Sequence, residues 1–435
     1  MISLRCTLQL RLKNQMKKFI NDISLARLKF APQNIKSIGA TIVAIASICM
    51  LAFLISKSSD VAGKISDFPE YYAPAKMIAD GNGANSYILT KLGEEQHSLF
   101  SGMGNRVVAL FVPPQGLALI SAIGMLNVAM AIMAWKVFLV GCLIVAIIFL
   151  ISTFSLNYKQ TCYLIAGLCL SYPCYEALRL GQLAPILLLS FSAAIYFLQK
   201  NKNIAAGLCL SLLIILKPQQ IFPFLAYLAG LRRWRALTVL MGMFILFTLI
   251  AFFEIGTSGF QNYFALGRSP ESAAYMQPEL NATLRGQLMR LMPAHSNMIL
   301  DASIVIYAIV LAFSYLYGQQ TRDKPDTILR GVLSIIPIGL VTSLHCHDYD
   351  LLLLVPSLIV IFTERIVPFN SLFQLLLIFA GIPFLLPLAI NIHYDYLLHG
   401  GKINILFLEL AILSLTIIYR VCQVSQKIDT KVTPK

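Results

Sequence analysis

The sequence predicts an all-α polytopic membrane protein, a bundle of about 12 transmembrane helices. Hydrophobic residues make up 58% of the 435 residues and charged residues only 12%, and the mean hydropathy is +0.75. Runs of 15 to 20 apolar residues recur along the chain. This composition excludes a soluble globular domain.

The first predicted span, 38–56, follows a basic segment, 1–37, in which Asp22 is the one acidic residue. Positive segments favour the cytoplasmic side, so this span runs outward. No small-residue cleavage site follows it, which favours a signal anchor over a cleaved signal peptide.

Later basic loops extend this topology. The loops 199–203, 232–235 and 322–330 are rich in Lys and Arg and are predicted to be cytoplasmic. Both termini are then cytoplasmic, and we expect a multi-pass protein of the plasma (inner) membrane. The remaining predicted spans are 127–151, 161–179, 183–198, 204–216, 219–230, 236–254, 298–318, 331–344, 350–364, 368–391 and 403–420.

The segment 107–126 is apolar, yet the topology requires both of its ends to lie outside. We therefore predict that it is re-entrant or lies along the interface, broken by Pro113 and Pro114. The chain divides into a basic N-terminal segment (1–37), a transmembrane domain (38–420) and a cytoplasmic tail (421–435). Within the domain, 57–106 and 255–297 are predicted outer loops.

The first outer loop contains an acidic, tyrosine-rich segment. Asp67 and Glu70 have the spacing of a helix cap, Pro69 suits the first turn, and Gly81 suits the end. One interpretation is an amphipathic helix on the membrane surface whose Asp is only a cap. The other is that Asp67 is a general base that removes a proton from a hydroxyl.

Isolated cations stand at the predicted outer ends of spans, at Arg179, Lys217 and Arg285. Each alone can snorkel to the interface. Together they predict a clamp for a lipid-linked phosphate or diphosphate.

The segment His345-Cys-His347-Asp348-Tyr-Asp350 lies at another outer span end. It predicts a hydrogen-bonded wall of a binding pocket, with a divalent metal site as the alternative. The nine cysteines show no paired spacing, so we expect neither a disulfide framework nor a zinc site. The basic residues cluster at span ends, so we expect no nucleic-acid partner.

Several short motifs, in this order, resemble glycosyltransferase family 87. They are Asp67-Phe with Tyr71-Tyr72, Pro113-Pro114, Gly181-Gln182, Lys217-Pro218, the RRWRA segment from Arg232, and Asn281-x-Thr283-Leu284 with Gly286. The resemblance covers about residues 38–360. Two positions depart from the family pattern: Phe111 stands where Tyr is usual before Pro-Pro, and Leu183-Ala184-Pro185 replaces an Asn after Gly-Gln.

The resemblance implies a GT-C-like bundle and an inverting hexosyltransferase, mannosyltransferase-like, acting at the cell envelope. The expected partners are a polyprenyl-phosphate donor of mannose or a pentose, a lipid or glycan acceptor, and membrane lipids. No cofactor and no metal are expected. Asp67 is the predicted catalytic residue. The predicted substrate-binding residues, for donor phosphate or acceptor, are Tyr71, Tyr72, Arg179, Gln182, Lys217, Asn281, Arg285, His345 and His347.

Two other functions remain open at this stage. A transporter or flippase of a lipid-linked saccharide places polar residues at the membrane midplane, whereas here they concentrate on the outer side. The other is an inactive family member that acts as a scaffold. Such a protein would not need Asp67, so the presence of this residue argues against it.

Overall fold

The computed structural model describes residues 35–57, 66–269, 277–363 and 400–432, and within these ranges it consists of helices and connecting turns with no β-strand. The predicted span 368–391 and most of the N-terminal basic segment lie outside the described residues. The α-helices are α2 (Ile35–Lys57), α3 (Phe68–Ala79), α4 (Leu89–Leu99), α5 (Pro114–Ile120), α6 (Val128–Phe154), α7 (Tyr158–Leu170), α8 (Tyr172–Leu180), α9 (Ala184–Gln199), α10 (Asn203–Leu216), α11 (Phe222–Gly230), α12 (Trp234–Leu266), α14 (Leu284–Leu291), α15 (Ser296–Thr321), α16 (Thr327–Thr342), α17 (Val355–Phe362) and α21 (Ile405–Val432). The 3₁₀-helices are η2 (Gly83–Asn85), η3 (Ser121–Met125), η4 (Pro218–Gln220), η5 (Pro278–Leu280), η6 (Pro293–His295) and η7 (Asp348–Leu354).

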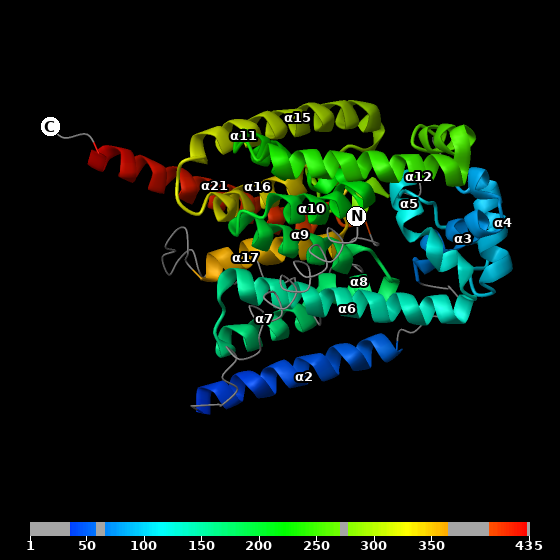
Figure 1. Cartoon of the computed structure of the whole chain (residues 1–435), viewed down its shortest axis with the longest axis horizontal. Coiled ribbons are helices and arrows are strands. Elements are labelled where there is room, and N and C mark those ends of the chain that lie inside the picture. The colour runs from blue at the N-terminus through cyan, green and yellow to red at the C-terminus, as the bar shows by residue number, and fades with distance from the viewer. Residues whose placement is uncertain (1–34, 58–65, 270–276, 364–399, 433–435) are drawn as a thin grey trace, which may run out of the picture.

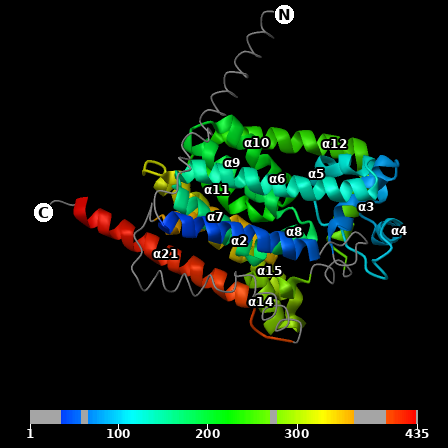
Figure 2. The ribbon, with the colours of Figure 1, turned by 90° about the horizontal axis from the view of Figure 1, so that it is seen from below.

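Among the described residues, four helical stretches are long and apolar enough to cross a membrane: Ser37–Ser56, Val128–Phe154, Trp234–Leu266 and Pro293–Thr321. They lie roughly parallel in the bundle, while α3, α4 and α5 gather at one end of it (Figures 1 and 2). Shorter apolar helices, among them α9, α10 and α16, pack between the long ones. The described residues therefore confirm an all-helical fold with helices able to cross a membrane, while the number of about 12 spans stays a prediction.

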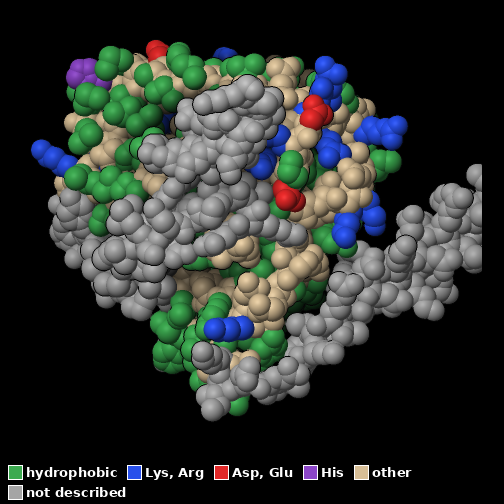
Figure 3. All heavy atoms as spheres, turned by 90° about the vertical axis from the view of Figure 1, so that its left-hand side faces the viewer, with side chains coloured by type: hydrophobic (Ala, Val, Ile, Leu, Met, Phe, Trp, Pro, Cys, Tyr) green, Lys and Arg blue, Asp and Glu red, His purple; other side chains and the backbone are tan. Residues whose placement is uncertain are grey.

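The basic loops meet at the end of the bundle opposite α3. Arg233 donates from Nη1 to Oδ1 of Asn201 at 2.8 Å, and Arg232 and Arg322 border one cavity. Lys and Arg side chains are conspicuous on this face, among few acidic ones (Figure 3). The loops predicted to share one side of the membrane thus lie together in space.

Several predicted elements differ from the structure, among them the spans 219–230 and 350–364, each of which is a 3₁₀-helix followed by a short α-helix. The predicted span 161–179 is two helices, α7 and α8, because Ser171 caps the second helix by accepting a hydrogen bond from the Cys174 amide, and Pro173 occupies its first turn. The predicted outer loop 255–297 begins as helix, since α12 continues to Leu266 through a kink at Gly256, whose φ of 64° suits glycine.

The segment 107–126 is broken by its prolines, as predicted. Residues 107–113 are not helical, and α5 begins at Pro114 and passes directly into η3. Pro113 lacks the N–H that a continuous helix would use, and its φ of −58° and ψ of 157° are extended. The short helix packs against α12 and α3.

Helix α3 is not the amphipathic surface helix of the first interpretation, because most of its residues are buried within the protein. Residues on all its faces are buried, including Pro69, Ala73 and Pro74 opposite the tyrosines. Phe68 stacks on Tyr72 with ring centroids 5.6 Å apart, and Tyr71 packs 5.7 Å from the Trp135 ring of α6. Helix α3 is therefore fixed inside the protein at the end of the bundle, which holds its side chains rigidly.

Candidate active site

A polar cavity of about 580 Å³ lies between the start of α3, the end of α8 and the start of η7. It is lined by charged and ionisable side chains from segments far apart in the sequence. They are Asp67, Glu70, Tyr71, Arg106, Glu176, Arg179, Lys217, His345, His347, Asp348 and Tyr349. The cavity is the place where the polar residues of this apolar chain converge.

Asp67 precedes α3, but its side chain makes no capping hydrogen bond. Its Oδ1 instead accepts from Nη2 of Arg106 at 2.6 Å, and its Oδ2 accepts from Nε2 of Gln182 at 2.8 Å. The predicted capping box with Glu70 is wrong, because these two donors take both carboxylate oxygens. Burial raises the pKa of Asp67 above 3.8, and the charge and hydrogen bond of Arg106 oppose that rise.

Gly181 explains how Gln182 reaches Asp67. It ends α8 with a φ of 78°, a left-handed conformation that suits glycine. Its carbonyl accepts a hydrogen bond from Nε1 of Trp135 at 2.8 Å, and the amide of Asp67 donates to the carbonyl of Leu180 at 3.0 Å. The Gly-Gln motif is thus a helix end tied directly to the backbone of Asp67.

Glu70 lies one helical turn from Asp67 and is buried. Burial, together with the neighbouring charge of Asp67, raises the pKa of Glu70 to about 8. It therefore carries a proton at neutral pH. Of the two carboxyl groups on this helix, Asp67 is the one suited to accept a proton.

The cations of the cavity are each paired with a carboxylate. Arg179 forms a two-pronged contact with Glu176, one turn earlier in α8. The Nζ of Lys217 lies 2.8 Å from Oδ1 of Asp350, with Lys217 12% and Asp350 0% exposed.

The segment after α16 forms the opposite wall. Burial lowers the pKa of His347 to about 4 and holds that of His345 well below 6.5, so both rings are neutral at neutral pH. Burial and the charge of Glu176 raise the pKa of Asp348 to about 7. Within the described residues, no group of three or more His, Cys, Asp or Glu side chains is arranged to hold a metal ion.

Most predicted substrate-binding residues line the cavity, namely Tyr71, Arg179, Gln182, Lys217, His345 and His347. Three others do not. Tyr72 donates to the Leu126 carbonyl at 2.7 Å, Asn281 accepts from the Cys346 amide at 3.1 Å, and Arg285 donates to the Leu344 carbonyl at 3.1 Å. Asn281 and Arg285 thus support the wall segment from behind.

Two charged residues of the site, Arg106 and Glu176, were not predicted from the sequence. Arg106 is the last residue of the predicted first outer loop, a lone cation ahead of an apolar run, and this position is the signal that could have found it. Glu176 lies three residues before Arg179 in one helix, a spacing at which opposite charges meet.

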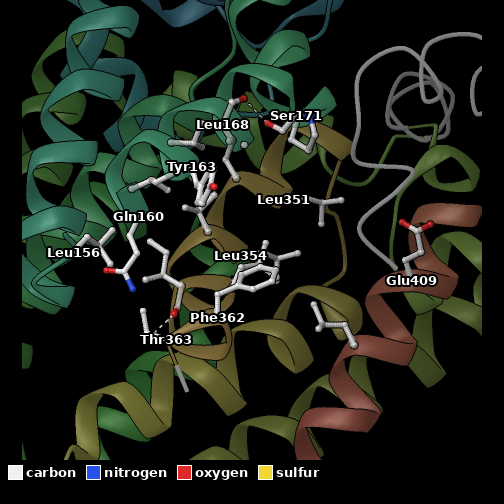
Figure 4. Close-up of a pocket in the computed structure, with 18 residues that line it drawn as sticks. Leu156, Gln160, Tyr163, Leu168, Ser171, Leu351, Leu354, Phe362, Thr363 and Glu409 are labelled. Atoms are coloured by element: carbon white, nitrogen blue, oxygen red, sulfur yellow. Dashed lines mark hydrogen bonds between the residues drawn. The ribbon is translucent and has the colours of Figure 1, made fainter. Parts of the chain in front are cut away.

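A second cavity of about 630 Å³ lies beside the first and is almost wholly apolar. Figure 4 shows Leu168 and Tyr163 of α7 facing Leu351 and Leu354 of η7 across it, with Glu409 of α21 at its edge. Both cavities share two walls: α8 and η7 present polar residues to one cavity and apolar residues to the other.

Comparison with known proteins identifies the family of the chain. Neither a curated protein nor a solved structure matches it. The family profile described as glycosyltransferase family 87 matches residues 111–343, more than half of the chain, a range that includes Arg179, Gln182 and Lys217 but not Asp67. With its apolar helices and this match, the chain is a membrane glycosyltransferase and belongs to glycosyltransferase family 87.

Proposed function

We propose that the protein transfers a sugar, mannose or a pentose, from a polyprenyl-phosphate donor to a hydroxyl of a lipid or glycan acceptor. The observation that carries the proposal is the polar cavity, where Asp67 faces the cations Arg106 and Arg179 at one end of a membrane bundle. The transfer takes place on the outer side of the plasma membrane.

The reaction needs one base and one anion site. The acceptor oxygen attacks the anomeric carbon and forms the new glycosidic bond, while the bond from that carbon to the phosphate oxygen breaks. The acceptor proton passes to Asp67, and the phosphate leaves with the electron pair of the broken bond. Arg106, Arg179 and Lys217 offset the charge on that phosphate.

The neutral histidines suit the binding of sugar hydroxyls, beside a base at Asp67 and cations for the phosphate. His345 and His347 carry no charge at neutral pH, because burial lowers the pKa of both. They can hydrogen-bond to sugar hydroxyls, for which a neutral ring offers both a donor and an acceptor nitrogen.

The donor's isoprenoid chain has a matching apolar environment. The apolar cavity shares α8 and η7 with the polar one, so a phosphate held near Arg179 places the first isoprene units beside Leu351. Burial of such a chain stabilises the complex by about 0.8 kcal/mol per CH₂ group.

A cavity-filling substitution tests this placement. Gly167 of α7 lines the apolar cavity, and an added Cβ there meets nothing within 4 Å. Gly167→Leu should therefore fold normally and weaken the binding of a long polyprenyl phosphate roughly tenfold, because part of the chain loses its buried site. Binding of a short-chain prenyl phosphate should change little.

The matched control is Gly141→Leu. Gly141 lies on α6, away from both cavities, and an added Cβ there is equally free of contacts. Binding can be measured with purified protein in nanodiscs. Equal effects of both substitutions, or no effect of Gly167→Leu on the long-chain ligand, would place the chain elsewhere.

The orientation of this GT-C-like bundle, with about 12 spans and cytoplasmic termini, is part of the proposal. A cysteine introduced at Glu94, on α4 at the same end of the bundle as the polar cavity, should react with a membrane-impermeant reagent in intact cells. One at Asp323, in a basic loop, should react only after permeabilisation. Both side chains are well exposed, at 65% and 88%, so the reversed pattern would refute the orientation.

A further inference from the structure

Asp67 is the end of a chain of hydrogen bonds that starts in helix α3. The hydroxyl of Tyr71 donates to Oε1 of Gln182 at 2.6 Å, and Nε2 of Gln182 donates to Oδ2 of Asp67 at 2.8 Å. Tyr71 is 1% and Gln182 2% exposed. Water is therefore largely excluded from the hydrogen bond between Tyr71 and Gln182, while Asp67, whose side chain is 18% exposed, opens onto the polar cavity.

The direction of this chain is fixed by chemistry. A glutamine side chain has a donor end and an acceptor end, and only one of its two orientations turns N–H toward a carboxylate. A hydroxyl that donates to Oε1 selects that orientation. If Gln182 turned over, its carbonyl oxygen would face the carboxylate oxygen of Asp67, an unfavourable contact in a buried site.

Aromatic packing holds the first member of the chain in place. The Tyr71 ring lies 5.7 Å from the Trp135 ring, and Trp135 donates to the carbonyl of Gly181, the residue before Gln182. The ring, the end of α8 and the amide are thus parts of one packed unit.

Resting on the proposed function, in which Asp67 is the base, we propose that Tyr71 and Gln182 are positioning residues for that base, in place of the substrate contacts predicted from the sequence. Gln182 on Oδ2 and Arg106 on Oδ1 together prevent the carboxylate from rotating. Each oxygen keeps a further lone pair for the acceptor hydroxyl. The charged groups that act on Asp67 are Arg106 and Arg179, while the neighbouring Glu70 carries a proton at neutral pH.

The first test is Tyr71→Phe. It removes the hydroxyl that holds the other end of the Gln182 amide, so the contact of Gln182 with Asp67 loosens and kcat should fall roughly 10- to 100-fold with the donor KM unchanged. The matched control is Tyr72→Phe, at the next position of α3. Tyr72 is equally buried, at 1% exposed, but its hydroxyl donates to the Leu126 carbonyl, so kcat should stay close to that of the native protein.

The second test is Gln182→Glu. Tyr71 can still donate to this side chain, but Asp67 now faces a carboxylate instead of an N–H donor. The pKa of Asp67 should rise, so the acid limb of the kcat/KM profile should move to higher pH. A residue 182 side chain that lay away from Asp67 would leave that limb in place.

The assay uses the full-length protein with a polyprenyl-phosphate mannose or pentose and cell membranes as acceptor. A raised donor KM with unchanged kcat in Tyr71→Phe and Gln182→Glu would make both residues substrate contacts and overturn the inference. Equal losses in Tyr71→Phe and Tyr72→Phe would also overturn it. Failure of the proposed function looks different: the native protein would not consume the donor, or Asp67→Asn would remain active.

Discussion

Asp67→Asn should lower kcat by roughly 10²-fold or more, the usual scale for loss of a general base, while leaving donor binding and membrane insertion intact. Asparagine keeps the size of the side chain and one oxygen for the Arg106 guanidinium, but it cannot accept the acceptor's proton. Since the Asp67 side chain makes no capping bond, helix α3 does not depend on its charge. Turnover of the lipid-linked donor and its binding in nanodiscs are the two measurements.

The control for this variant is Glu70→Gln. Glu70 already carries a proton at neutral pH because burial raises its pKa to about 8, so the neutral amide should change the rate only a few-fold. A larger loss of kcat in Glu70→Gln than in Asp67→Asn would make Glu70 the base. The native rate should fall as the pH drops through the pKa of Asp67, which lies above 3.8, because the base must be unprotonated to act.

Lys217→Ala should cause the largest loss of stability. It leaves Asp350, which is 0% exposed, buried without its partner, and removing one member of a buried ion pair typically costs about 3–5 kcal/mol. Lys91→Ala is the matched control: Lys91 pairs with Glu94 at the surface, where both side chains are more than half exposed, and such pairs contribute about 0–1 kcal/mol. Unfolding in a denaturing detergent titration measures both effects.

The double variant Lys217→Ala/Asp350→Ala separates stability from function. It removes both charges, so most of the stability should return. If Lys217 also binds the donor phosphate, the double variant should be stable but should still have a higher donor KM than the native protein. Native kinetics there would limit Lys217 to the ion pair, and a stable single variant Lys217→Ala would show that Asp350 is not buried as described.

The helices could be predicted from the sequence because apolar runs and basic loops report the membrane environment directly. The break at Ser171 has a local signal in the sequence, because Ser followed by Tyr-Pro is typical of a helix start. The burial of α3 could not be predicted from periodicity alone. Its tyrosines form an apolar face, but only the tertiary structure shows that Pro69 and Pro74 are covered as well.

The candidate site was predicted in part for a similar reason. Lys217 stood out as a cation at the end of an apolar run, Asp67 through its helix-cap spacing to Glu70, and Gln182 through the family resemblance. Arg106 and the long-range ion pairs could not be predicted from the sequence. Only the fold brings Arg106 to Asp67 and Lys217 to Asp350. Sequence spacing suggested that Asp67 caps its helix, yet two long-range donors take its oxygens instead.

The most direct measurement is donor consumption by the purified protein in nanodiscs with membrane acceptors, comparing a polyprenyl-phosphate sugar with the corresponding nucleotide sugar. The native protein should release polyprenyl phosphate and label the acceptor from the lipid-linked donor alone, and Asp67→Asn should do so at roughly one-hundredth of the rate or less. Transfer from the nucleotide sugar, or equal release by both proteins, would contradict the assignment of the polar cavity as the catalytic site for a lipid-linked donor.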